Sequence, residues 1–346
     1  MKAIVYEDVG RLAVHDVPDP TIEDPADAVV RVSSSAICGS DLHFFHGKAP
    51  LSPGDGIGHE GMGVVEAVGP DVKRFAVGDR VVISFVIACG GCWFCQRGQT
   101  SLCQHYRMVG GGPFGGSLGG TQAEAVRVPV ADVNLLRVPD GMADEQALFL
   151  GDILTTAYYG TAIAGIRPEE TVAVVGAGPV GFLAMQAARV HGAGRVLSLD
   201  MEPARLELAE RFGAVPINVK ERHPQSAVFD LTDGRGADVV VECVGNEVAY
   251  ETATRSVRSG GTVAVVGVYV SEQAEIPLGV YWTRMLTVRF AGICPVQAWW
   301  EKALGAVQAG TIDPVPIISH TMPLDEGPKG YELFDTRQAT KVVLKP

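Results

Sequence analysis

The stretch TVAVVGAGPVG, residues 171–181, decides the fold of the second half of this chain. Its apolar start, Val172–Val175, predicts a strand that is buried on both faces. Gly176, Gly178 and Gly181 follow in the spacing G-x-G-x-x-G, and a helical pattern comes next. Glycines placed this way allow a tight turn, a close approach of the backbone to a pyrophosphate and close packing of helix on strand.

The sequence after this turn predicts a dinucleotide site. A helix that begins at Pro179 and Val180 would direct its first N–H groups and the positive end of its dipole to phosphates. Asp200 ends the next predicted strand, where a carboxylate accepts hydrogen bonds from ribose hydroxyls and repels a 2′-phosphate. We therefore expect NAD rather than NADP, with Arg205 weakening that preference. The alternative is a structural glycine turn with a surface aspartate.

Outward from this motif, buried strands and helical segments alternate from about residue 153. This alternation predicts a doubly wound α/β domain around a parallel sheet. We expect strands at residues 171–175, 195–199, 239–243 and 262–266, and helices at 180–191 and 203–212. A helix at 296–309 and a final strand at 341–344 follow, and that strand is expected to return to the first domain.

Residues 1–150 have a different texture, in which short β-branched runs are bounded by Gly, Pro and Asp. This texture predicts a β-rich unit. Strands are expected at residues 2–6, 28–32, 63–68 and 81–85. The glycine-rich part of the segment 89–120 is expected to form a surface loop.

Composition narrows the function classes. A chain of 346 residues has room for about two domains. Lys and Arg number 28 against 40 Asp and Glu, for a net charge of −12, which disfavours nucleic acids and anionic membranes as partners. The sequence offers neither a signal peptide nor an apolar span, so we expect a cytoplasmic protein. Seven cysteines in that compartment favour metal binding over disulfides.

Four of these cysteines, Cys89, Cys92, Cys95 and Cys103, lie within one short segment. Four thiolates at this spacing predict one tetrahedral zinc, and an all-cysteine set leaves no position for water, so the site should be structural. Disulfides, free thiols and a zinc ribbon on nucleic acid are the alternatives. The expected compartment argues against disulfides, and the redox liability of dense thiols argues against free thiols. The acidic net charge argues against a zinc ribbon on nucleic acid.

A second set of possible ligands is dispersed along the chain. The segments are CGSDLH at residues 38–43, GHEGMG at 58–63, and Asp152 within LGDILTTAYYG. With the cysteine cluster and the glycine turn, they resemble the zinc-dependent medium-chain alcohol dehydrogenase family over essentially the whole chain. Residues 58–72 fit the family signature G-H-E-x-x-G-x5-G-x-x-V. Aspartate as third ligand resembles the bacterial secondary-alcohol and formaldehyde-dehydrogenase-like branch.

The resemblance implies a catalytic zinc on Cys38, His59 and Asp152, with the fourth position left for water or substrate. Glu60 is implied as a transient ligand, or else as a residue behind the ligands. Asp41 is expected to hydrogen-bond the far nitrogen of His59 and to fix its tautomer.

Four further roles follow from the resemblance. Ser40 would hydrogen-bond the alcohol oxygen and accept its proton, and His43 would pass that proton to solvent through the cofactor ribose. Lys341 would meet the pyrophosphate, and Phe85 would line the substrate pocket.

The fold implied is α/β: a GroES-like β-rich catalytic domain over 1–152 and 292–346, with a structural zinc lobe at 89–103, and a Rossmann domain over 153–291. NAD and two zinc ions per chain are implied, one catalytic and one structural. The activity implied is reversible hydride transfer between a small or medium alcohol and NAD, in a homodimer or homotetramer.

Other readings compete with this one. Within the class they are a polyol or sugar dehydrogenase and an aldehyde-dismutating relative. Asp152 favours simple alcohols, because polyol-using members often replace the third protein ligand by water. Outside it, a non-catalytic zinc-bearing protein would lack an open-site ligand, and the zinc-free quinone reductase branch would lack the cysteine cluster.

Overall fold

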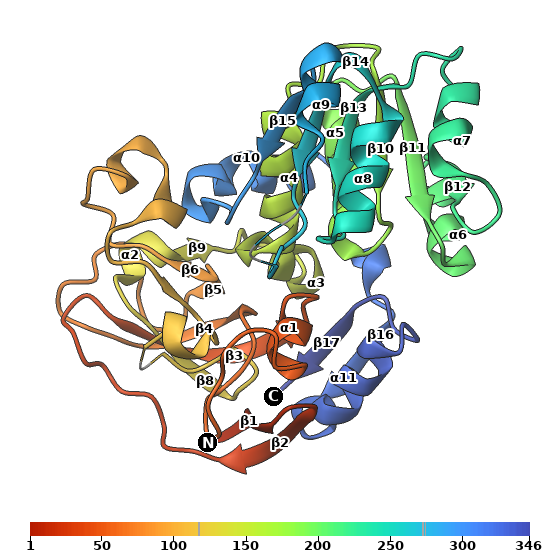
Figure 1. Ribbon diagram of the computed structural model, residues 1–346. Helices are drawn as coiled ribbons and strands as arrows, with labels where there is room; N and C mark the ends of the chain where they lie inside the picture. Colours follow the sequence, from red (N-terminus) through yellow and green to blue (C-terminus); the bar gives the residue numbers. More distant parts are fainter. Residues whose placement is uncertain (117, 272, 274) are drawn as a thin grey trace. The chain divides into compact units, whose positions relative to one another are not determined.

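The computed structural model describes residues 1–116, 118–271, 273 and 275–346 (Figure 1). The described chain divides into two compact units. Unit 1 comprises Met1–Thr155, Pro295–Gly305 and Pro314–Pro346, and unit 2 comprises Thr156–Cys294 and Ala306–Asp313. The functional domains expected from the sequence, 1–152 with 292–346 and 153–291, remain a prediction.

Unit 2 is built on a six-stranded sheet in the described residues, with strand order β12-β11-β10-β13-β14-β15 and every neighbouring pair parallel. Its strands are β10 (Thr171–Val175), β11 (Arg195–Asp200), β12 (Val215–Asn218), β13 (Ala237–Glu242), β14 (Val257–Val265) and β15 (Thr287–Phe290). The order reverses at β10, which pairs with β11 on one side and β13 on the other. The doubly wound parallel sheet predicted from the sequence is confirmed.

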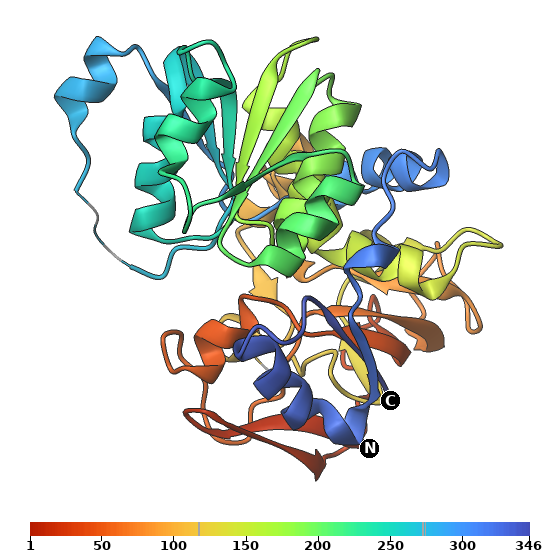
Figure 2. The same cartoon turned by 90° about the vertical axis from the view of Figure 1, so that its right-hand side faces the viewer.

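Helices cover both faces of this sheet (Figure 2). They are α4 (Ile153–Ala164), α5 (Pro179–Val190), α6 (Pro203–Arg211), α7 (Pro224–Asp230) and α8 (Glu247–Ser256). The short helix α9 (Leu278–Thr283) precedes β15, and α10 (Val296–Gln308) follows it. On one face, Ala227 of α7 and Ala253 of α8 pack in a buried cluster with Ala173 and Val175 of β10. Apolar side chains on both faces of β10 explain why its sequence reads as one continuous run.

Unit 1 holds a seven-stranded sheet within the described ranges, ordered β16-β17-β3-β4-β5-β9, with β8 added beside β3. Its strands are β3 (Ala28–Ala36), β4 (Glu60–Val68), β5 (Arg80–Ile83), β8 (Ala125–Val128), β9 (Leu135–Arg137), β16 (His320–Pro323) and β17 (Val342–Lys345). Two smaller pairs are β1 (Lys2–Asp8) with β2 (Arg11–Asp16) and β6 (Val86–Ile87) with β7 (Arg107–Met108). The helices are α1 (Asp41–Phe45), α2 (Ala131–Asn134), α3 (Asp144–Ala147) and α11 (Gly327–Asp335).

The C-terminal strand β17 returns to this first unit, as the sequence predicts. It pairs antiparallel with β3, with Val343 opposite Ala36. The chain end therefore lies one strand away from the segment that carries Cys38.

The glycine-rich segment after β7 is not the surface loop expected from its composition. Gly110, Gly112 and Gly120 are buried. A Cβ on Gly110 would lie 2.2 Å from the carbonyl oxygen of Gly58, and one on Gly120 would lie 1.9 Å from that of Ile57. Glycine is needed here because this backbone packs directly on the backbone that precedes His59.

Among the described residues, no helix is both long and apolar enough to cross a lipid bilayer.

Candidate metal centre and dinucleotide turn

Three segments of unit 1 bring Cys38, His59, Glu60 and Asp152 together. Cys38 follows β3, and His59 precedes β4, which pairs with β3 so that Ala36 stands opposite Glu60. Asp152 caps the 3₁₀-helix Leu148–Gly151. One ligand atom from each of the four residues lies within 4.8 Å of the others, and all four side chains are buried.

The individual distances suit a shared cation. Asp152 Oδ2 lies 3.1 Å from His59 Nε2 and 3.6 Å from Cys38 Sγ. The hydroxyl of Ser40 lies 3.3 Å from Cys38 Sγ and 3.1 Å from His59 Nε2. Thiol, imidazole, carboxylate and hydroxyl groups therefore converge on one point in unit 1.

The other nitrogen of the His59 ring is held from behind, as the sequence predicts. Asp41 Oδ1 lies 2.9 Å from His59 Nδ1, and both side chains are buried. The second carboxylate oxygen of Asp41 accepts a hydrogen bond from the Cys38 backbone N–H at 3.0 Å. Asp41 thus directs Nε2 of His59 toward the cluster.

Lys341 has a different partner from the one expected. Its ammonium lies 2.5 Å from Glu60 Oε1, donates to the carbonyl oxygen of Ile37 at 2.8 Å, and is 1% exposed. An ammonium enclosed in this way is not available to a pyrophosphate, so its expected role in cofactor binding is corrected. The same ion pair holds Oε1 of Glu60 behind the cluster.

Electrostatics make the cluster a site for a cation. Burial and the nearby acids raise the pKa of the Cys38 thiol to about 11. Burial alone would lower the pKa of His59, but Asp41 and the other acidic groups raise it well above its usual value. Burial raises the pKa of Glu60 to about 7, although Lys341 opposes that shift. Burial is thus the main cause for Cys38 and Glu60, and the neighbouring acidic groups are the cause for His59.

Zinc fits this donor set. Cys38, Asp41, Glu60 and Asp152 are anionic when ionised, and Lys341 is the buried lysine among them. A divalent cation would balance the charge and would favour the thiolate and carboxylate forms that bind it. One thiolate, one imidazole and one carboxylate form a three-ligand set of the type found in catalytic zinc sites.

Two aromatic residues flank the cluster. The ring of Phe85 lies 5.9 Å from that of His59, between centroids. Burial raises the pKa of Tyr106 to about 12, and the charges of His59 and Asp152 also act on its hydroxyl. The expectation for Phe85 as a pocket residue stays a prediction, and Tyr106 is a neighbour that the sequence analysis missed.

His43 lies on α1, five positions after Cys38, and is partly buried. Burial, Lys48 and His46 lower its pKa from the usual 6.5. In the described part of the chain, no hydrogen bond joins its ring to the Ser40 hydroxyl. The two groups expected to share a proton path are therefore close in sequence but not in direct contact.

The four cysteines of the second cluster also come together. Sγ of Cys92 lies 3.5 Å from that of Cys95 and 3.9 Å from that of Cys103, and Cys89 lies 4.0 Å from Cys95. Tetrahedral zinc–sulfur bonds of about 2.3 Å place sulfurs about 3.8 Å apart. Two backbone N–H groups, those of Cys89 and His105, donate to Cys103 Sγ at 3.3 Å.

The glycine turn in unit 2 has the geometry that its spacing predicts. Gly176 adopts φ +93°, and Gly178 caps α5, with Pro179 at its first position. A Cβ on Gly181 would lie 1.8 Å from the carbonyl oxygen of Gly176, so only glycine lets helix and strand approach this closely. Val180 follows in the first turn of the same helix.

Asp200 lies beside this turn and does more than the sequence suggested. Its Oδ2 accepts a hydrogen bond from Ala177 N–H at 2.6 Å, and its Oδ1 accepts from Met201 and Glu202 N–H. Arg205 Nη1 lies 4.0 Å from Oδ2. The carboxylate therefore shapes the turn itself.

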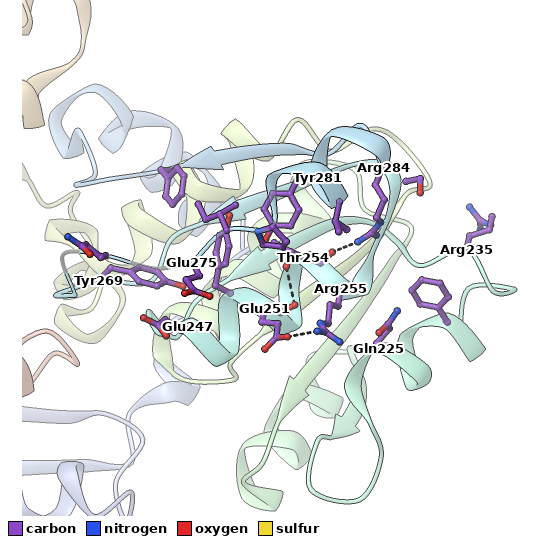
Figure 3. Close-up of a pocket in the computed structure, with 18 of the residues that line it drawn as sticks. Gln225, Arg235, Glu247, Glu251, Thr254, Arg255, Tyr269, Glu275, Tyr281 and Arg284 are labelled. Carbon is purple, nitrogen blue, oxygen red and sulfur yellow. Dashed lines mark hydrogen bonds and ion pairs between the residues drawn. The ribbon is translucent and has the colours of Figure 1, made fainter.

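A separate pocket lies on unit 2, with a volume of about 1210 Å³ (Figure 3). Tyr250 and Tyr281 line it, and Glu251 and Arg255 of α8 form an ion pair of 2.6 Å at its wall. Arg284 donates to the carbonyl oxygen of Thr254. None of the residues predicted to act in catalysis or cofactor binding lines this pocket in the described chain.

Comparisons with known proteins agree with this picture. Residues 24–140 match the alcohol dehydrogenase GroES-like domain, and residues 179–308 match the zinc-binding dehydrogenase family. An uncharacterized zinc-type alcohol dehydrogenase-like protein of Bacillus subtilis is 38% identical, covering 100% of both chains.

Solved structures show the same fold. An alcohol dehydrogenase from Thermus sp. ATN1 is 44% identical with a TM-score of 0.95, covering 100% of this chain and 99% of its own. A zinc-binding dehydrogenase from Sinorhizobium meliloti 1021, solved bound to NADP, is 30% identical with a TM-score of 0.87, covering 100% and 99%. The GroES-like and Rossmann-like fold class is confirmed, and the comparisons support zinc and a nicotinamide cofactor.

Proposed function

Because the chain belongs to the zinc-dependent medium-chain alcohol dehydrogenase family, we propose that it transfers a hydride reversibly between a small or medium alcohol and NAD. The alcohol would become an aldehyde or ketone. The observation that carries this proposal is the convergence of Cys38, His59 and Asp152 within unit 1. A non-catalytic zinc-bearing protein would have no need for these three donors beside the Ser40 hydroxyl.

The chain's own residues would divide the work. Zinc, when bound by Cys38, His59 and Asp152, supplies a Lewis acid for the alcohol oxygen, and the nicotinamide supplies the hydride acceptor. The Ser40 hydroxyl would orient that oxygen and take its proton. Glu60 would serve as a transient ligand through the oxygen that Lys341 does not hold. A second, structural zinc would occupy the four cysteines.

The test is a panel of primary and secondary alcohols, polyols and aldehydes, assayed with NAD and NADP by nicotinamide absorbance. We expect NAD reduction by at least one alcohol class and two zinc ions per chain by elemental analysis. Two bound zinc ions without reduction by any alcohol would favour the non-catalytic zinc-bearing protein. Reduction by polyols alone would favour the polyol dehydrogenase.

We expect Asp200→Asn to lower kcat/KM for NAD by about 10- to 100-fold, because a ribose hydrogen bond to a charged group contributes about 1.5–3 kcal/mol. The same change should improve relative use of NADP, since it removes repulsion of the 2′-phosphate. Steady-state kinetics with both cofactors measure the ratio. Glu202→Gln, a neighbouring change that keeps Asp200, is the control, and an unchanged ratio in Asp200→Asn would contradict this role.

The lowered pKa of His43 sets a pH dependence for proton release. Neutral imidazole accepts a proton and imidazolium does not, so kcat for alcohol oxidation should fall as pH drops through a value below 6.5. His43→Gln should slow oxidation by roughly tenfold just above that pH, with the deficit shrinking toward pH 9 as hydroxide takes the proton directly. A pH profile of kcat checks this, and a deficit that is equal at every pH would exclude the relay.

We further propose that the chain is a homodimer or homotetramer, with a second copy on the free edge of unit 2. β15 is one of the two edge strands of the described sheet, Phe290 on it is 64% exposed, and Trp282 of α9 is 81% exposed. An edge strand beside exposed apolar residues is self-complementary about a two-fold axis. A cytoplasmic location also remains a proposal.

Trp282→Glu should therefore shift the assembly toward monomers in analytical ultracentrifugation, because a charge would be buried at the contact. Val77→Glu, at an exposed apolar residue of unit 1, is the control and should leave the assembly unchanged. Sedimentation of the unmodified chain as a monomer at micromolar concentration would refute the proposal.

A further inference from the structure

A line of buried polar side chains runs from the metal centre to the C-terminal helix α11. Asp41 stands behind His59, and Gln122 Nε2 donates to Asp41 Oδ2 at 3.3 Å. Tyr331 Oη, on α11, donates to Gln122 Oε1 at 2.9 Å. Each of these four side chains is at most 1% exposed, so protein groups rather than solvent set their orientations.

The amide of Gln122 has one orientation that satisfies all its neighbours. Its Nε2 faces two acceptors, Asp41 Oδ2 and the carbonyl oxygen of Ala36 at 3.4 Å. Its Oε1 faces the hydroxyl donor of Tyr331. Turning the amide over would set its oxygen against both acceptors, so the network specifies a single arrangement.

Two glycines, Gly58 and Gly330, leave room for the side chains around the Gln122–Tyr331 hydrogen bond. Gly58 adopts φ +94°, and a Cβ there would lie 2.3 Å from Gln122 Cγ, so the glycine before His59 makes room for Gln122. Next to Tyr331, a Cβ on Gly330 would lie 3.1 Å from Ile37 Cδ1. The residues that directly precede His59 and Cys38 thus pack against Gln122 and Gly330.

We propose that Gln122 and Tyr331 are positioning residues of the metal centre, which hold the Asp41 carboxylate and, through it, the ring of His59. Histidine ligands depend on the group that binds their second nitrogen, and a fixed carboxylate keeps Nε2 aimed at the metal. Helix α11, far along the chain, is then part of the metal site. This inference rests on the proposed function, because it requires zinc on Cys38, His59 and Asp152.

The test is the rate of zinc release from the zinc-loaded protein to excess chromogenic chelator. Asp41→Asn identifies the catalytic phase, because it disturbs His59 and leaves the four-cysteine site untouched. Tyr331→Phe should accelerate that phase by about tenfold, the lower end of the usual effect of residues behind metal ligands, and should leave the other phase unchanged. Tyr6→Phe is the matched control, since Tyr6 is a buried tyrosine of the same apolar cluster.

A double variant shows whether Tyr331 acts through Asp41. If it does, Tyr331→Phe should add less than twofold to the release rate in the Asp41→Asn background. A tenfold effect that persists in that background, or equal release rates for Tyr331→Phe and Tyr6→Phe, would overturn the inference and leave the proposed function standing. A protein with no release phase sensitive to Asp41→Asn would overturn the catalytic zinc as well.

Discussion

Asp152→Asn should lower kcat by more than about 100-fold and reduce the zinc content from two ions per chain to one. The carboxylate oxygen of Asp152 lies 3.1 Å from His59 Nε2 and 3.6 Å from Cys38 Sγ, so it is placed to share their ion. A neutral amide is a weaker ligand, and changes to groups behind a ligand already cost 10- to 100-fold. Elemental analysis and steady-state kinetics on the same preparation measure both effects.

Two further variants sharpen this prediction. Asp152→Cys supplies the thiolate that many family members carry at this position and should retain the second zinc. Asp140→Asn makes the same chemical change on an exposed loop and should alter neither quantity. Unchanged turnover in Asp152→Asn would remove this residue from the ligand set, and loss of both zinc ions would show that the fold of unit 1 had failed.

Lys341→Met should lower the free energy of unfolding by about 3–5 kcal/mol, the usual effect of removing one partner from a buried ion pair. Lys341 Nζ lies 2.5 Å from Glu60 Oε1, with exposed fractions of 1% and 0%. The variant would leave Glu60 as an uncompensated carboxylate in the interior. Urea unfolding measures the change in the free energy of unfolding, provided that the dependence of this free energy on urea concentration has the same slope in both proteins.

A double variant separates charge from packing. Lys341→Met with Glu60→Gln removes both charges and should recover most of the lost stability, because no buried ion is then left unpaired. Lys345→Met, on β17, removes an ammonium that pairs with Glu145 at a partly exposed site and should cost under about 1 kcal/mol. Equal losses for Lys341→Met and Lys345→Met would show that burial of the ion pair contributes nothing.

Local sequence patterns were sufficient to predict the short motifs and part of the elements of this chain, whereas strand β2 and helices α8 and α11 were not among the expectations. The strand, turn and helix around Gly176 could be predicted because one short segment contains the apolar run, the glycines and the helical pattern. The four cysteines are equally local. For Cys38, His59 and Asp152 the resemblance to a family supplied the grouping that spacing alone does not give, and their assignment as ligands stays a prediction.

Composition gave a wrong prediction for the glycine-rich segment, where close backbone packing rather than exposure to solvent explains the glycines. The glycines from Gly110 to Gly120 resemble a surface loop because glycine is common in turns. At Gly110 and Gly120, glycine is needed because the backbone of Gly58 and Ile57 lies against them. A local sequence pattern does not reveal which distant segment of the chain will pack against it.

The sequence by itself determined which residues have the chemistry to bind zinc and a dinucleotide, because ligand type and turn geometry are local properties. The tertiary structure alone decided which residues stand behind Glu60 and Asp41. Lys341 meets Glu60 across 281 positions of the chain, and Tyr331 meets Gln122 across 209. Such contacts depend on strand pairing and helix packing, in particular on the pairing of β17 with β3. The free energy that holds them in place comes from packing of the whole core, so the residues next to either partner in the sequence do not reveal them.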